Sequence, residues 1–309
     1  MLGTKPSRVG HATAARFIDP KALARIDNLG LVAKTVVEGF LGGLHRSPYL
    51  GLSVDFAEHR AYMPGDDIRR IDWRLFGRTD RFYVKEFEAD TNANFSVLLD
   101  ISRSMDFGYE GITKLDYGRF VAASLLYLSS KQRDRVGLIT FDSDIVDFVP
   151  PAAKHLDIAL HTLERVQSTR AGNLRTTLPK IAEAFRRRSI IALITDCYDD
   201  PKAVVDAVNA LRQKGNDLIV FHILDPVEIT FSYDEAVSFE DLETGERLSV
   251  VPDKMRDKYR QMMSEHTKTL SKLMGENPID YALFDTSTPL DWALFTYLSR
   301  RERMSRLRR

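Results

Sequence analysis

A short apolar strand that runs into a loop of oxygen-bearing side chains constrains the fold more than any other stretch. Residues 95–99 are almost wholly apolar, which is typical of a strand covered on both faces in a parallel sheet flanked by helices. Asp100, Ser102 and Ser104 follow, separated by single residues. They lie at the carboxyl end of the strand, where such sheets bind ligands, so one loop can turn a carboxylate and two hydroxyls toward a common point. These hard oxygen donors suit Mg²⁺ or Mn²⁺.

Similar strands alternate with helical segments through the rest of the chain. The apolar pattern predicts strands over residues 136–141, 189–195, 218–224 and 281–284, and helices over 114–130, 156–166, 178–187, 201–211, 255–274 and 290–300. A further strand over 145–149 is expected to pair with 136–141 at a sheet edge and to end at Pro150-Pro151. The alternation predicts an α/β fold, a doubly wound and mostly parallel sheet flanked by helices, with right-handed crossovers.

Asp196 follows the strand at 189–195, and the usual winding order brings it opposite Asp100. In that order the first and fourth strands are neighbours where the winding reverses, and ligands bind at their carboxyl ends. Two carboxylates about 4 Å apart repel by roughly 4 kcal/mol at an effective dielectric constant of 20, and a divalent cation reverses this repulsion. Asp196→Asn is therefore predicted to lose stabilisation by magnesium but to melt no lower than wild type in chelator.

Composition excludes several classes of function. The 309 residues carry 44 Lys and Arg against 44 Asp and Glu, so no overall field attracts nucleic acid or anionic lipid. The single cysteine, Cys197, cannot form a disulfide within the chain, and we predict a small buried hydrophobic side chain rather than a reactive thiol. We expect no signal peptide, no membrane span and a cytoplasmic location.

The N-terminal part of the chain has a different pattern. Helices are predicted at residues 20–28 and 31–41. From Gly51 to Thr91 charged residues alternate with aromatic or aliphatic ones, which predicts antiparallel strands with one solvent-exposed face. Pro64-Gly65 suits the centre of a type II turn between them.

These patterns divide the chain into two parts. Residues 1–92 are predicted to hold N-terminal helices and a small β-rich lobe, and residues 93–309 an α/β domain. A hairpin with Gly245 in its turn is expected as an insertion at about 228–251.

The β-rich lobe carries a distinctive series of residues. The series comprises Arg60, Tyr62, Pro64-Gly65-Asp66-Asp67, Arg69, Ile71-Asp72-Trp73, Arg74 and Val84-Lys85-Glu86. It resembles the signature of the domain-of-unknown-function 58 family, which joins it to a von Willebrand factor A-like domain. We interpret these charges as a structural network that packs the lobe against the main domain, with Trp73 as the anchor.

The Asp-x-Ser-x-Ser loop resembles the metal-ion-dependent adhesion site of von Willebrand factor A-type domains. In such sites two serines and a threonine bind the ion directly, two aspartates hold it mainly through water, and a partner's carboxylate completes the octahedron. The resemblance implies a metal site made of Asp100, Ser102, Ser104, Thr176 and Asp196.

Two departures from the adhesion-site pattern affect this assignment. Asn173-Leu174-Arg175 stands where the pattern usually has two glycines, so Thr176 and Thr177 are hard to separate as ligands. Cys197 replaces a glycine that commonly follows the last aspartate, so the loop there could have a different shape.

The resemblance implies a non-enzymatic, metal-dependent protein-interaction module whose partner offers an acidic side chain. Family members commonly accompany MoxR-type AAA+ ATPases, which implies an adaptor in assembly, maturation or stress response. The alternative is a magnesium-dependent phosphotransferase of the haloacid dehalogenase type, with Asp100 as nucleophile and Asp196, Asp199 and Asp200 as metal ligands. Ser102 counts against it, because that family needs a second carboxylate at this position. A third hypothesis is a scaffold whose site has no function.

Overall fold

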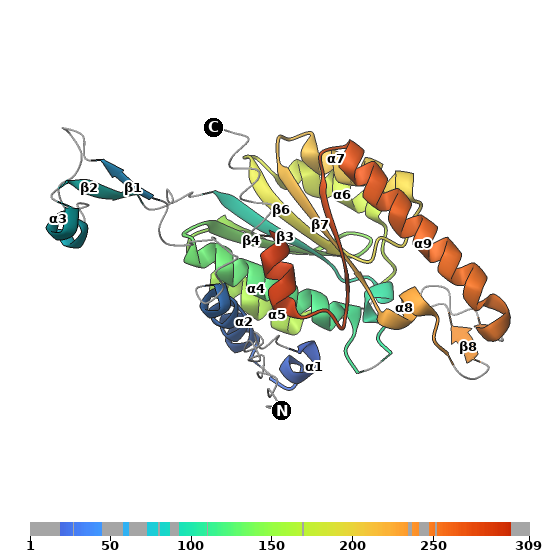
Figure 1. Ribbon diagram of the computed structural model, residues 1–309. Helices are drawn as coiled ribbons and strands as arrows, with labels where there is room; N and C mark the ends of the chain where they lie inside the picture. The colour runs from blue at the N-terminus through green and yellow to red at the C-terminus, as the bar shows by residue number, and fades with distance from the viewer. Residues whose placement is uncertain are drawn as a thin grey trace, which may run out of the picture.

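A six-stranded sheet forms the centre of the computed structural model (Figure 1). The structure describes residues 19–26, 28–44, 58–61, 73–79, 81–86, 93–109, 111–168, 170–233, 237–240, 247–250 and 252–297. The strands are β3 (Asn94–Asp100), β4 (Arg135–Phe141), β5 (Ile145–Ala152), β6 (Ser189–Thr195), β7 (Asp217–Leu224) and β10 (Asp280–Asp285). Their order is β10-β7-β6-β3-β4-β5, and all neighbours are parallel except β4 and β5.

The winding of this sheet reverses at β3. This first strand of the sheet pairs with β4 on one side and with β6, the fourth strand, on the other. The predicted fold class, a doubly wound and mostly parallel α/β sheet, is therefore confirmed, together with the neighbouring first and fourth strands on which the expected site depends.

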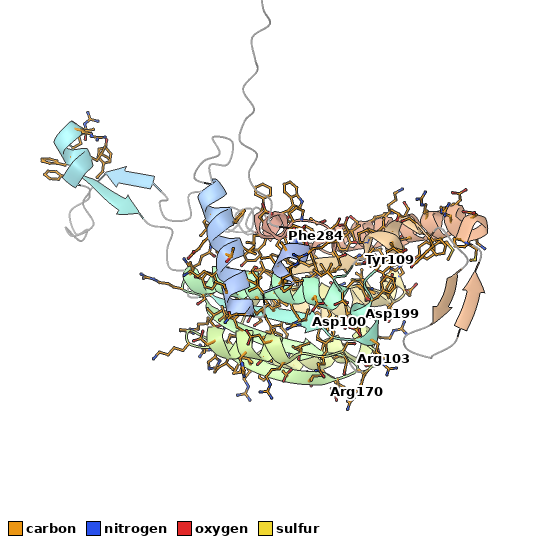
Figure 2. All side chains as sticks on the ribbon, turned by 90° about the horizontal axis from the view of Figure 1, so that it is seen from below. Asp100, Arg103, Tyr109, Arg170, Asp199 and Phe284 are labelled. Carbon is orange, nitrogen blue, oxygen red and sulfur yellow. The ribbon has the colours of Figure 1, made fainter. Side chains whose placement is uncertain are left out.

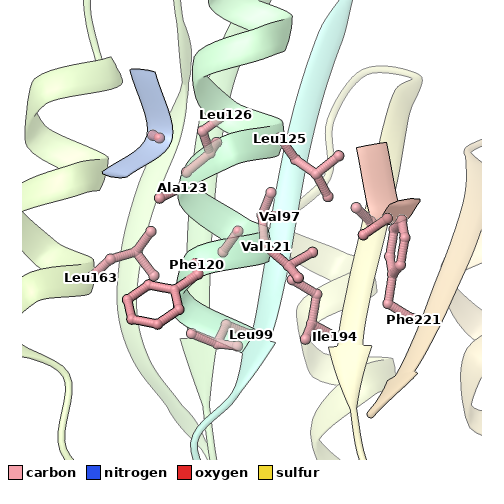
Figure 3. Close-up of a cluster of buried hydrophobic side chains, with 14 of the residues drawn as sticks. Val97, Leu99, Phe120, Val121, Ala123, Leu125, Leu126, Leu163, Ile194 and Phe221 are labelled. Atoms are coloured by element: carbon pink, nitrogen blue, oxygen red, sulfur yellow. The ribbon is translucent and has the colours of Figure 1, made fainter. Parts of the chain in front are cut away.

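Helices cover both faces of the sheet. They are α4 (Lys114–Lys131), α5 (Leu156–Arg165), α6 (Leu174–Ala184), α7 (Pro201–Arg212) and α9 (Pro252–Glu276). Successive residues of β3 point to opposite faces, so Val97 and Leu99 belong to the core under α4, whereas Leu98 belongs to the core under α6, α7 and α9. Figure 3 shows the first of these cores, with side chains of α4 such as Val121 and Leu125 facing side chains of the sheet.

Several element boundaries differ from the predictions: the helix predicted at 20–28 ends at Leu23, and two further differences have a clear local cause. The helix expected at 178 begins at Leu174, because the Asn173 side chain caps it by accepting a hydrogen bond from the Thr176 amide (3.1 Å). Pro179 lies inside this helix rather than near its start. Strand β5 continues through Pro150-Pro151 to Ala152, which an edge strand tolerates because it has no partner on its outer side.

The N-terminal helices α1 (Pro20–Leu23) and α2 (Leu29–Leu44) precede the lobe. Buried residues of α2, among them Val32 and Val36, share a core with α4, so this helix packs on the α/β domain. The division of the chain at residue 92 stays a prediction.

The β-rich lobe contains the antiparallel pair β1 (Glu58–Ala61) and β2 (Tyr83–Glu86), and helix α3 (Trp73–Thr79). Figure 1 draws these three elements apart from the six-stranded sheet. The Pro64-Gly65 turn and most of the surrounding signature lie outside the described residues, as does the Trp73 side chain.

The predicted insertion is present as the antiparallel pair β8 (Val237–Glu240) and β9 (Arg247–Val250). Its turn, including Gly245, lies outside the described residues. The first part of the expected insertion instead forms a short helix, α8 (Pro226–Thr230), which the sequence reasoning missed. Residues 290–297 form the closing helix. Among the described helices, we find none with enough length and apolar character to cross a bilayer.

Candidate metal site

Asp100 connects the loop after β3 directly to the end of β6. It ends β3 and is 3% exposed. Its Oδ2 accepts a hydrogen bond from the hydroxyl of Thr195 (2.7 Å), the last residue of β6, and its Oδ1 accepts one from the Ser102 amide (2.9 Å). Asp196, which follows Thr195, therefore lies beside Asp100, as the sheet order predicts.

The loop before α6 lies against Ser102. The Ser168 hydroxyl donates to the Ser102 carbonyl oxygen (2.9 Å), and the Arg103 amide donates to the Arg170 carbonyl oxygen (2.8 Å). A Cβ at Gly172 would lie 2.7 Å from Ser102 Cβ and 3.1 Å from its Oγ. Only glycine therefore lets this loop approach the serine so closely. Figure 2 labels Asp100, Arg103 and Arg170 near one another.

The donor set fits a small divalent cation. The hydroxyl oxygens of Ser102 and Ser104 are 3.1 Å apart. Adjacent oxygens of a regular octahedron around Mg²⁺ are about 2.9 Å apart, given metal–oxygen bonds of 2.0–2.1 Å. Clusters of three or more His, Cys, Asp or Glu side chains suited to a metal are absent from the described parts of the chain. A metal here would therefore depend on the serine hydroxyls.

Thr176 and Thr177 differ in their surroundings. Thr177 is fully buried, and its hydroxyl donates to the Asp142 carbonyl oxygen (3.2 Å). Thr176 is exposed in the first turn of α6, and its hydroxyl faces the Asn173 carbonyl oxygen at 3.4 Å. Since its hydroxyl makes only this weak contact in its own turn, Thr176 is the better candidate to bind a ligand.

The electrostatics of Asp100 favour a nearby cation. Burial raises the pKa of this carboxyl to about 6, and the charge of Asp196 adds to that rise, while hydrogen bonds from Ser102 and Thr195 oppose it. A divalent ion would stabilise the ionised form of Asp100.

Asp196 has a partner that the sequence reasoning did not foresee. Its Oδ2 accepts a hydrogen bond from Lys114 Nζ at 2.9 Å, and the same ammonium donates to Glu228 Oε1 at 2.8 Å. The Lys114 side chain is fully buried. Burial opposes its charge, but the two carboxylates outweigh this effect, and the pKa of Lys114 is raised above its ordinary value. The Asp196 carboxylate is thus paired with the Lys114 ammonium, a cation that the chain itself supplies.

Cys197 has a backbone conformation that glycine adopts more readily than other residues. Its φ of 51° lies in the left-handed region, and the side chain is fully buried. Burial and the charges of Asp196 and Asp100 raise the pKa of this thiol well above its ordinary value. Cys197 is therefore a small buried side chain with a protonated thiol, as predicted.

Three residues of this site were missed from sequence. From sequence, Lys114 marks only the start of a helix. A cation in the first turn is unfavourable to the helix dipole, however, and this is a signal that Lys114 has a carboxylate partner elsewhere. Gly172 is the only glycine between Ser168 and Leu174, which is a usable signal for close backbone approach. Thr195 carries no signal beyond its place at the end of a strand.

Solved structures with some likeness to this chain include two bacterial proteins. The conserved hypothetical protein BatB from Bacteroides thetaiotaomicron is 18% identical, with a TM-score of 0.47, and the match covers 68% of this chain and 99% of that one. A von Willebrand factor type A protein from Catenulispora acidiphila is 12% identical, with a TM-score of 0.32, and the match covers 61% of this chain and 44% of that one.

Similar sequences place the chain in a family. The uncharacterized proteins Rv1480 of Mycobacterium tuberculosis and Mb1516 of Mycobacterium bovis are each 26% identical over 281 residues, which cover 89% of this chain and 87% of theirs. Residues 58–269 match the family described as "Protein of unknown function DUF58". Because this match covers more than half of the residues, the chain belongs to the DUF58 family.

Proposed function

We propose that this protein is a non-enzymatic, metal-dependent protein-interaction module. Its site would hold Mg²⁺ or Mn²⁺ through the hydroxyls of Ser102, Ser104 and Thr176, with Asp100 and Asp196 acting through water. The bound ion would offer an open coordination position to a carboxylate of the partner. The observation that carries the proposal is the pair of serine hydroxyls, 3.1 Å apart, beside a buried aspartate at the reversal point of the sheet.

The surroundings of the site favour an acidic partner. Arg103, Arg170 and Arg175 are exposed. Arg103 lies between Ser102 and Ser104, Arg170 lies in the loop before α6, and Arg175 precedes Thr176 in the first turn of α6. Complementary charge of this kind speeds association and disfavours wrong partners. Tyr109 and Tyr198 are also exposed nearby, at 54% and 45%, and aromatic side chains are enriched in protein interfaces.

The geometry favours binding over phosphoryl transfer. Both oxygens of Asp100 accept hydrogen bonds, from Thr195 and from the Ser102 amide, which leaves this carboxylate poorly disposed as a nucleophile. Ser102 carries a hydroxyl where the phosphotransferase would need its acid and base.

The choice of partner rests on the family resemblance. A MoxR-type AAA+ ATPase is the partner that it implies, with this chain as a cytoplasmic adaptor in assembly, maturation or stress response.

Metal-dependent capture of a partner tests the proposal. Wild-type protein immobilised in native lysate is expected to retain a partner in Mg²⁺ and to release it in chelator. Ser102→Ala and Thr176→Val should each lower the amount retained at least tenfold, since each removes an oxygen donor. Thr177→Val is the matched control, because its hydroxyl bonds Asp142 instead; we expect it to capture the partner as wild type does.

Two results would contradict this function. Equal capture in Mg²⁺ and in chelator would show that the interaction needs no metal. Turnover of a generic phosphate ester in Mg²⁺ that Asp100→Asn abolishes would favour the phosphotransferase.

A further inference from the structure

The ammonium group of Lys114 occupies the interior of the molecule, close to the candidate metal site. Lys114 is the first residue of α4, after the N-cap Thr113, and its side chain is 0% exposed. The nitrogen lies 2.9 Å from Asp196 Oδ2 and 2.8 Å from Glu228 Oε1. A buried charge is stable only with close partners, and this lysine has two.

Aromatic rings complete the surroundings of this ammonium. Its nitrogen is 4.5 Å from the ring centroid of Tyr198 and 5.9 Å from that of Phe107. Cations are attracted to the faces of such rings at these distances. Two carboxylates and two aromatic rings thus surround a site suited to one positive charge, and the ammonium group of Lys114 occupies it.

The same ammonium links two parts of the fold. Asp196 belongs to the loop after β6, whereas Glu228 belongs to α8, where its other oxygen accepts a hydrogen bond from the Asp225 amide (2.8 Å). Helix α8 and the segment after it are in turn held to α9, because Arg260 donates to the Thr230 carbonyl oxygen and Arg256 Nη2 donates to the Tyr233 carbonyl oxygen (2.8 Å). Lys114 therefore connects the candidate metal site, at the carboxyl ends of β3 and β6, to the segment that leads into the β8–β9 hairpin.

We propose that the ammonium of Lys114 competes with the divalent ion for Asp196. When no metal is bound, the same ammonium holds the loop after β6 and helix α8 together. This inference rests on the proposed function, since it concerns how the same site holds its metal. Because Lys114 already neutralises Asp196, the divalent ion gains less from that carboxylate. The site would then bind metal more weakly than its oxygen donors alone would allow, and its fold would not depend on metal.

Replacement of the lysine by a neutral side chain of similar length tests this competition. Lys114→Met removes the positive charge, and Mn²⁺ binding is measured with the full chain from the electron paramagnetic resonance signal of free Mn²⁺. We expect the variant to bind Mn²⁺ about tenfold more tightly than wild type, because the Lys114 ammonium no longer repels the ion or neutralises the Asp196 carboxylate. It should also melt at a lower temperature than wild type in chelator and gain more stability from Mn²⁺.

Lys131→Met is the matched control. Lys131 ends the same helix, but its side chain is 44% exposed and pairs with Glu38 at 3.5 Å on the surface. Its replacement should leave Mn²⁺ binding and melting unchanged. If Lys114→Met does not fold, Lys114→Met combined with Glu228→Gln removes one of the two buried carboxylates as well, and the same titration is made on that double variant.

The outcomes separate this inference from the proposed function. If wild type binds Mn²⁺ and the lysine variant binds it no more tightly, the competition is refuted while the metal site stands. If only the lysine variant binds Mn²⁺, the competition is supported and the metal-dependent function of the natural chain fails. If neither binds Mn²⁺, both are overturned.

Discussion

Asp196→Asn is expected to lower the free energy of unfolding by about 2 kcal/mol in chelator. Breaking a buried ion pair by removing one partner typically costs about 3–5 kcal/mol. The loss here should be smaller, because the amide oxygen can still accept from Lys114, Glu228 still bears a charge, and Asp100 is freed from a repulsive neighbour. Urea denaturation with chelator present measures the change.

This expectation reverses the one drawn from sequence alone. The sequence shows two aspartates and no cation near them, so it predicts no cost for the substitution. The buried ammonium of Lys114 instead gives Asp196 a structural role. Asp206→Asn, at an exposed position of α7, serves as the control and should change stability by less than about 0.5 kcal/mol. Equal stability of the Asp196 variant and wild type in chelator would contradict the role of this ion pair.

Cys197→Val is expected to destabilise the protein by about 3 kcal/mol. The left-handed conformation at φ 51° strains the wild-type cysteine already, and a β-branched valine tolerates it less well, so the substitution adds strain. The additional methyl group must also fit a fully buried position, where overpacking costs about 1–3 kcal/mol. Urea denaturation of the variant and wild type measures the loss.

Cys197→Gly separates backbone strain from packing. Glycine adopts this conformation without strain but loses the buried thiol and gains freedom in the unfolded chain, so we expect a net change within about 1 kcal/mol of wild type. If the valine variant were as stable as the glycine variant, the left-handed turn after Asp196 would be refuted.

The sheet could be predicted because its signals are local. Residues 95–99 and 189–195 are short apolar runs that end in an acidic residue, and the rule for doubly wound sheets makes their strands neighbours. The structure pairs Leu98 with Leu193 in these strands, in the expected parallel arrangement. The contact between Asp100 and the residue before Asp196 follows from that pairing.

The ion pair could not be predicted, because it depends on side chains from distant elements. Lys114 reaches Glu228 across 114 positions of sequence, through a helix, α8, that carries no amphipathic pattern of its own. The start of α6 was misplaced for a different reason. Thr176 and Thr177 resemble loop residues, and only the cap made by Asn173 shows that the helix has already begun.

Anomalous diffraction from crystals grown with Mn²⁺ tests the central claim most directly. The claim is that the loops after β3 and β6 and the first turn of α6 together hold one divalent cation. It predicts a single strong peak within bonding distance of the Ser102 and Ser104 hydroxyl oxygens, with Asp196 still paired to Lys114. A protein saturated with Mn²⁺ that shows no peak there, or shows its peak elsewhere, would contradict the account.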